Sequence, residues 1–323
     1  MITDIMKEVI TIIVPDSIYG YGIDKDAFQR VPNLKRIKCV AQTNLTVEEN
    51  PANYKNIPIV ILAESQTSVS FAYYPVGGEE IGLWTQGDNT VKAFILPNTV
   101  INIGEKAFAN RTMLRYVYIP DSVVSIGYGA FARTGIESII IPDSVIELAD
   151  GKAHVINDIN DMWRGGRKGE YFTSLELGIF EQSSDLGIVT LSKNITRIPS
   201  AMFTDCWSLY YVEMFSGVES IGKAAFYNTP FLKNITLPDT LKVIEEYAFA
   251  ISGLTSLIIP NSVTEIGKRA FFDCSGLTSI VLSDNITDIA GDAFEDCVNL
   301  TSITYKGETY SKIAEVILKI MNS

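Results

Sequence analysis

Apolar residues recur along most of the chain in a phrase that repeats about every 23 residues. The phrase, [IL]-G-x-x-A-F, stands at Ile103–Phe108, Ile126–Phe131, Ile221–Phe226 and Ile266–Phe271. Its last position is filled by Phe203, Phe226, Phe249, Phe271 and Phe294, at spacings of 23, 23, 22 and 23 residues. A fixed period in this range predicts a solenoid, in which each coil buries its apolar side against its neighbours.

Each phrase is followed by a six-residue run of the form L-x-x-[IV]-x-[LI], as in Leu114–Ile119, Leu209–Met214 and Leu277–Leu282. These runs are rich in β-branched residues and bounded by turn residues, so we expect short strands. The next segment, D/N-S/T-V-x-x-I-G, predicts a second extended piece, and the A-F segment has room for a turn or two of helix. Stacking the coils gives a parallel sheet with strands about 4.8 Å apart.

The pattern predicts one solenoid domain over residues 1–323, with two insertions. Residues 1–90 are expected to form degenerate N-terminal coils with an insertion near 63–80. Residues 91–305 are expected to form regular 22–23-residue repeats with an insertion near 149–174. In the remaining residues, 306–323, Ile313, Val316, Ile317 and Ile320 have helical spacing. We expect this helix to cap the last coil, which would otherwise expose core residues.

Two long copies of the repeat are distinctive: I-P-D-S-V-V-S-I-G-Y-G-A-F at Ile119–Phe131 and I-P-N-S-V-T-E-I-G-K-R-A-F at Ile259–Phe271. Across most of its length the chain resembles the BspA-like leucine-rich repeat family. The fold we expect is therefore a repeat solenoid: a right-handed leucine-rich repeat superhelix with a parallel β-sheet, short second strands or helical turns in each coil, and a C-terminal capping helix. The resemblance also implies the role of a bacterial surface-associated adhesion or binding protein.

Composition and charge narrow the classes of partner. Apolar residues make up 47% of the chain and charged residues 20%, which is typical of a protein with a packed core. The formal net charge of -12 argues against nucleic acid and anionic membrane surfaces as partners. No stretch is long and apolar enough to insert in a membrane. The first residues lack the basic region of a signal peptide, which indicates a cytoplasmic protein, whereas the resemblance implies a cell-surface or secreted one.

The sequence offers little for catalysis or metal binding, so we expect no enzyme, no cofactor and no metal site. Cys206, Cys274 and Cys297 share one repeat position, three residues after the phenylalanine, which predicts a buried ladder of structural thiols. The single histidine, His154, has aspartates nearby, but they lack the spacing of a calcium loop, and zinc would need more His or Cys ligands. No nucleophile or phosphate-binding motif is present.

Outward positions of the predicted strands carry the candidate binding residues. Tyr116, Tyr118, Tyr210, Tyr211 and Glu213 are expected on the exposed face of the sheet, because side chains alternate along a strand. Tyrosine offers a large contact area at low entropic cost, although tyrosines are also ordinary strand formers. In the second insertion, Trp163, Arg164 and Arg167 combine aromatic and basic groups on an acidic protein, and the alternative there is a solvated loop tip.

Two hypotheses of function follow. The first is a non-catalytic protein that binds another protein through its sheet face and insertion loops. The second is a carbohydrate-binding or carbohydrate-active protein, in which tyrosine and tryptophan rings stack on a glycan. The second hypothesis predicts that the four tyrosines line one groove with carboxylates about 5–10 Å apart. A broad flat patch without paired acids favours the first.

Overall fold

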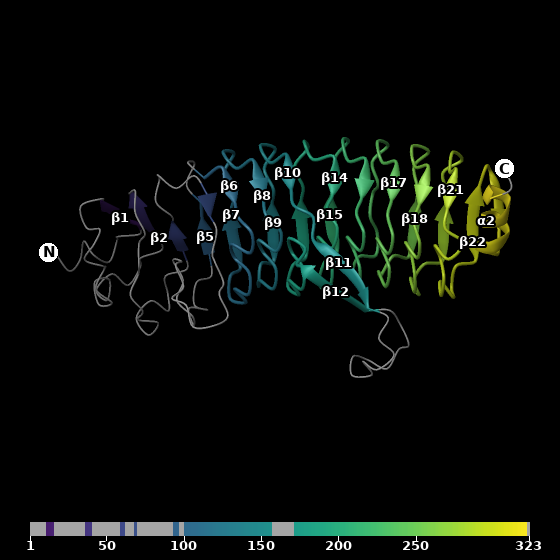
Figure 1. Cartoon of the computed structure of the whole chain (residues 1–323), viewed down its shortest axis with the longest axis horizontal. Coiled ribbons are helices and arrows are strands. Elements are labelled where there is room, and N and C mark those ends of the chain that lie inside the picture. Colours follow the sequence, from purple (N-terminus) through teal and green to yellow (C-terminus); the bar gives the residue numbers. More distant parts are fainter. Residues whose placement is uncertain are drawn as a thin grey trace.

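The structure, a computed structural model, describes residues 96–156 (apart from 97–99) and 171–321, together with five strands nearer the N-terminus. Side chains are described for Leu96 and for residues 100–152 and 177–321. The described elements form an elongated solenoid with strand β1 near one end and helix α2 at the other (Figure 1). The predicted repeat solenoid is therefore confirmed, and about eight of its coils are described with their side chains.

The first strands of the coils form a parallel ladder along the solenoid, which is interrupted at residues 232–238, where no strand forms. Within it, β1–β2–β3–β5–β7, β9–β13–β15 and β18–β20–β22 are hydrogen-bonded runs. The strands are β1 (Thr11–Pro15), β2 (Arg36–Val40), β3 (Ile59–Ile61), β5 (Ala93–Ile95), β7 (Tyr116–Tyr118), β9 (Ser138–Ile140), β13 (Ile188–Thr190), β15 (Tyr211–Glu213), β18 (Ser256–Ile258), β20 (Ser279–Val281) and β22 (Ser302–Tyr305).

The second strand of each coil forms another parallel ladder, in two runs, β4–β6–β8–β10 and β14–β16–β17–β19–β21. These strands are β4 (Ser68–Val69), β6 (Asn102–Ile103), β8 (Ser125–Ile126), β10 (Glu147–Leu148), β14 (Arg197–Ile198), β16 (Ser220–Ile221), β17 (Val243–Ile244), β19 (Glu265–Ile266) and β21 (Asp288–Ile289). The short second strands predicted from the repeat are therefore present.

The A-F segment of each coil consists of turns, with no helix in the coils that the structure describes. In most coils the residues two before and two after the phenylalanine have positive φ, as in Ala201 (57°) and Asp205 (59°). This alternation turns every second N–H along the solenoid, so that Phe203 donates to Ala225 of the next coil at 2.8 Å. Left-handed backbone costs an ordinary residue about 1–2 kcal/mol, and the bonds between coils offset that cost.

The repeated phenylalanines stack into a continuous column through the core. Eight of them, Phe108, Phe131, Phe180, Phe203, Phe226, Phe249, Phe271 and Phe294, lie with ring centroids 4.8–5.7 Å apart. The rings are almost parallel in most pairs, for example 1° between Phe108 and Phe131. Because each ring packs on the next, the column fixes the distance between coils.

A ladder of small polar groups runs beside this column, three residues after each phenylalanine from Phe131 onward. The thiols of Cys206 and Cys274 donate to the carbonyls of Phe180 and Phe249 in the preceding coil, and Ser183 makes the same bond to Phe131. Complete burial raises the pKa of the Cys206 thiol well above its ordinary value, so this sulfur stays protonated and unreactive. The position therefore selects a small buried donor.

The last coil is covered by a cap, as predicted. Strand β23 (Glu308–Tyr310) runs antiparallel to β22, and helix α2 (Ile313–Met321) buries Val316, Ile317 and Ile320. The two strands are joined by Lys306 and Gly307, both with positive φ, which matches the twist of a tight hairpin.

One hairpin interrupts the repeat without disturbing the column. Strands β11 (Lys152–Ile156) and β12 (Tyr171–Glu176) pair antiparallel and project from the side of the solenoid (Figure 1). Phe131 and Phe180, on either side of this hairpin, lie 49 residues apart in sequence, yet their centroids are 5.4 Å apart. The phenylalanine column therefore continues past the hairpin, and so does the first ladder, in which β9 pairs with β13.

We expect Phe226→Ala to lower the free energy of unfolding by about 3–5 kcal/mol, because it leaves a cavity in the column. Phe231→Ala is the matched control: this ring is 62% exposed, and its loss should cost less than about 1 kcal/mol. Urea unfolding followed by circular dichroism measures both variants. Equal losses would contradict a stabilising role for the column.

Candidate binding surface

The four predicted tyrosines lie on the outward face of the first ladder, in two pairs. Tyr116 and Tyr118 belong to β7, where Tyr116 is 48% exposed and the intervening Val117 is buried. Tyr211, 49% exposed, begins β15, and Tyr210 directly precedes it. Alternation along the strands places Tyr116, Tyr118 and Tyr211 in solvent, opposite the core. Tyr210 lies before β15, outside this alternation, and is 56% exposed.

Strands β9 and β13 lie between the two pairs and connect them through exposed isoleucines. Ile188 of β13 is level with Tyr211 of β15, and Ile140 of β9 is level with Thr190 of β13. Ile140 is 68% exposed, although it stands in the middle of the ladder. These side chains therefore form one surface, which we call the apolar face and which consists of Tyr116, Tyr118, Ile140, Ile188, Tyr210 and Tyr211. With strands about 4.8 Å apart, the face extends for about 15 Å along the solenoid.

The orientation of Tyr210 depends on a glycine in the preceding coil. A Cβ at Gly187 would lie 2.8 Å from Cε1 of Tyr210, so the ring occupies the space that a side chain at this position would fill. The Tyr210 ring therefore packs against the backbone of Gly187. A ring held in this way costs less entropy when a partner binds.

Charged groups lie at both ends of the strands that carry the apolar face. Before the strands, the Arg115 guanidinium donates to the Asp185 carboxylate and to the Gly135 carbonyl, and it lies 3.9 Å from Glu137. After the strands, the Glu213 carboxylate accepts a hydrogen bond of 3.2 Å from the Thr190 hydroxyl. The face therefore lies between carboxylates.

Two exposed aromatic residues beside the face were not predicted from the sequence. Trp207 stands in the turn that precedes β15, Phe231 stands in the corresponding turn of the next coil, and both are more than half exposed. The repeat pattern that located the tyrosines begins at the leucine of each strand, so it does not include these turns. Aligning the coils and asking which turn positions hold aromatic residues would have found both.

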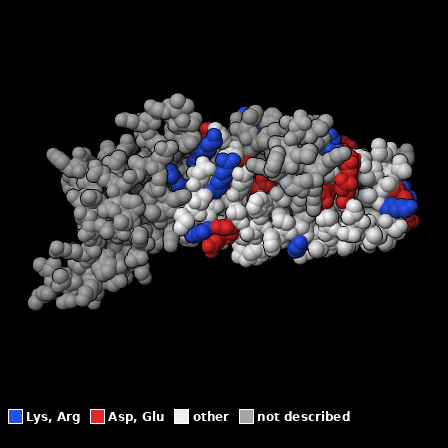
Figure 2. Space-filling model, turned by 90° about the horizontal axis from the view of Figure 1, so that it is seen from below, with Lys and Arg blue, Asp and Glu red and all other residues white. Residues whose placement is uncertain are grey.

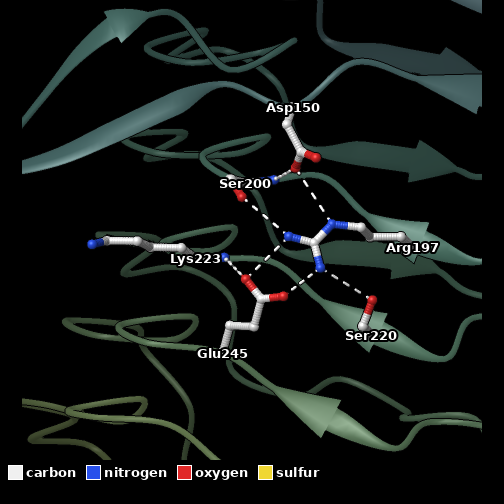
Figure 3. Close-up of polar contacts among 6 residues, drawn as sticks. All are labelled: Asp150, Arg197, Ser200, Ser220, Lys223 and Glu245. Atoms are coloured by element: carbon white, nitrogen blue, oxygen red, sulfur yellow. Dashed lines mark hydrogen bonds and ion pairs between the residues drawn. The ribbon is translucent and has the colours of Figure 1, made fainter.

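The hairpin is tied to the solenoid by a cluster of polar side chains around Arg197 of β14 (Figure 3). Its guanidinium forms a two-pronged ion pair with Glu245 and contacts Asp150, from the segment that leads into β11, at 3.4 Å. It also donates to the hydroxyls of Ser200 and Ser220. The pKa of Arg197 is raised above its ordinary value, mainly by the hydrogen bond to Glu245 and further by the charges of the Glu245 and Asp150 carboxylates.

Next to this cluster the second ladder has a gap. Gly127 and Gly222 donate to the preceding coil at 2.8 Å, but the same place after Ile198 is taken by Pro199, which has no N–H. Strands β10 and β14 are not paired, and a hollow of about 520 Å³ opens there, with Ile146, Glu147 and Arg197 in its lining. This hollow is not formed by the tyrosines of the apolar face.

Charge is unevenly distributed on the side from which the hairpin projects. Figure 2 shows a band of acidic side chains in the C-terminal half and several basic ones nearer the N-terminal end. Trp163, Arg164 and Arg167 lie outside the described residues, so their role in binding stays a prediction.

Within the described residues, no group of three or more His, Cys, Asp or Glu side chains is arranged to hold a metal ion. No helix in that same part of the chain has the length and apolar character needed to cross a membrane.

The model of the BspA type leucine rich repeat region matches the chain in six copies, over residues 84–162, 167–253 and 196–319. No curated protein matches the chain. The fold is similar to that of a leucine-rich repeat protein from Bacteroides ovatus, with 22% identity and a TM-score of 0.52. The match covers 76% of this chain and 63% of that one, so this chain spans less than two thirds of that protein.

Two other solved structures are similar over 92% of this chain. They are a leucine rich cell surface protein from Faecalibacterium prausnitzii (22% identity, TM-score 0.41, 79% of that chain covered) and the pneumococcal vaccine antigen PcpA (20% identity, TM-score 0.42, 68% covered).

We expect Arg197→Met to lower the free energy of unfolding by about 1–3 kcal/mol, because it removes hydrogen bonds to two carboxylates and leaves Glu245 without its cation. Proteolysis near residues 149–176 should also become faster, since Asp150 loses its partner. Lys193→Met is the matched control: its ion pair with Asp143 joins neighbouring coils but is more than half exposed, so its removal should cost about 0–1 kcal/mol. An unchanged rate of proteolysis in the Arg197 variant would contradict the role of Arg197 in holding the base of the hairpin.

Proposed function

Because the chain belongs to the BspA-type leucine-rich repeat family, whose repeats serve protein interaction or surface binding, we propose that it is a non-catalytic protein-binding module that uses the apolar face as its contact surface. Members of this family are generally non-enzymatic, which supports the non-catalytic part of the proposal. The location of the contact surface is our own inference from the geometry.

The observation that carries the proposal is the exposure of large apolar side chains in the middle of a regular ladder. Ile140 at 68% exposure contributes nothing to the core, whereas Ile139 beside it is buried. Single exposed apolar residues are ordinary, but a contiguous patch that crosses four strands is typical of a surface that a partner covers.

The composition of the face supports a protein as the partner. Tyrosine is enriched at the energetic centres of protein interfaces, because its ring buries a large area and its hydroxyl keeps a hydrogen-bonding group at the rim. The tyrosines lie in two pairs separated by isoleucines, which favours a broad contact over one narrow groove for a glycan.

We expect the triple variant Tyr116→Ala/Ile140→Ser/Tyr211→Ala to lose at least about tenfold in affinity for a captured protein, since hot-spot truncations each cost about 1–2 kcal/mol or more. Capture from cell lysate and from extracellular matrix, followed by titration of the purified partner, measures this loss. All three positions are exposed, so the variant should keep its midpoint of urea unfolding.

The matched control is Ile101→Ser/Ile146→Ser, which removes exposed isoleucines just before the second-ladder strands β6 and β10. Binding that survives in this control and is lost in the triple variant would support the apolar face. Equal binding by all three proteins would overturn it. Binding of the wild type to a glycan array, lost in the triple variant, would favour a carbohydrate ligand instead.

A further inference from the structure

We propose that the partner of the apolar face is a cationic amphipathic segment of a protein, in which apolar side chains are flanked by lysine or arginine. This inference rests on the proposed function and adds the chemistry of the partner. It follows from the carboxylates that border the face and from the way in which the two cations near them, Arg115 and Lys193, are already paired.

Carboxylates outnumber cations at the border. Glu137 and Asp185 lie where the strands begin, and Glu213 lies where β15 ends, so acidic groups stand on both sides of the apolar residues. Beyond the ends of the strands, Lys193 is paired with Asp143. Where the strands begin, Arg115 is bound by Asp185 and by the Gly135 carbonyl and is near Glu137. Its charge is compensated within the protein, and the border keeps an excess of negative charge.

Glu213 is the residue that most strongly favours a basic partner over a neutral apolar one. Its carboxylate is partly buried already, and the contact described for it is the hydroxyl of Thr190 at 3.2 Å. A neutral apolar partner that covered Ile188 and Tyr211 would remove water from this charge and provide no cation in return. Burying an unpaired carboxylate is strongly unfavourable, whereas a lysine or arginine at the same place would pair with it.

Glu137 favours the same partner through longer-range attraction. Its side chain is 70% exposed, and its contact with Arg115, at 3.9 Å, is a weak one. An exposed rim charge of this kind changes the rate of association and its salt dependence more than the final affinity. The net charge of -12 acts in the same direction, because it repels acidic partners.

Selection of a random peptide library displayed on phage tests the proposal directly. Peptides are retained by wild-type protein after removal of those that bind Tyr116→Ala/Ile140→Ser/Tyr211→Ala. We expect the retained peptides to combine aromatic or aliphatic residues with an excess of lysine and arginine. Their affinity should fall at least about threefold between about 50 and 300 mM salt, because screening weakens rim charge pairs.

The variant Glu137→Gln/Glu213→Gln should weaken these peptides by about threefold or more, with a smaller salt dependence. After Glu213→Gln, the side-chain carbonyl oxygen can still accept the hydrogen bond from the Thr190 hydroxyl, so we expect the fold to be preserved. Glu265→Gln/Asp288→Asn is the matched control, because it removes the same charge from exposed positions on β19 and β21 of the second ladder. Its affinity should stay within about twofold of wild type.

The outcomes separate the two proposals. Retained peptides without a basic excess, or with affinities that neither salt nor the Glu137/Glu213 variant changes, would overturn the cationic partner and leave the apolar face standing as the contact surface. Equal weakening by the second-ladder control would show attraction to net charge alone and would also overturn it. If no peptide distinguishes wild type from the triple variant, the apolar face itself is wrong.

Discussion

The structure depends on one constraint, the constant distance between successive coils. The phenylalanine column sets this distance through ring contact, and the alternating backbone of the A-F turns repeats it through hydrogen bonds such as that from Phe203 to Ala225. Each mechanism alone leaves freedom: stacked rings can slide, and single hydrogen bonds can fray. Together they hold ring and backbone in register, so residues at one repeat position form straight rows.

The rows explain how a surface is built on such a fold. An exposed row has no part in folding, so its side chains are chosen by other requirements. In β7, β9, β13 and β15 those side chains are tyrosine and isoleucine, with carboxylates at the strand ends. In β18 and β20 the rows hold more hydroxyl groups, although Ile258 and Val281 are also exposed. The change occurs where residues 233–236 form no strand, which divides the ladder into two surfaces.

Much of this fold was predictable from the sequence because the physical signal is periodic. Each phenylalanine is repeated with the same neighbours, so strands, core positions and outward positions follow from one coil, and the capping helix follows from its own spacing. The A-F turns were less accessible, since positive φ at residues such as Ala201 leaves no mark in the sequence. The Arg197 cluster joins residues from three coils and the base of the hairpin, and such long-range pairing becomes visible only when the coils are stacked. The repeat pattern located the tyrosines. That the isoleucines lie between the two tyrosine pairs follows only from the pairing register of β9 and β13.

The hairpin has a consequence for how such a protein can change. Phe131 and Phe180 stack as neighbours, so the hairpin of β11 and β12 between them adds nothing to the distance between the rings, and its base is held by the contact of Asp150 with Arg197. A segment of another length or sequence could therefore replace the hairpin while the phenylalanines on both sides remain stacked. The hairpin and the exposed strand residues can vary independently of each other, so one solenoid can change two recognition surfaces separately without loss of stability.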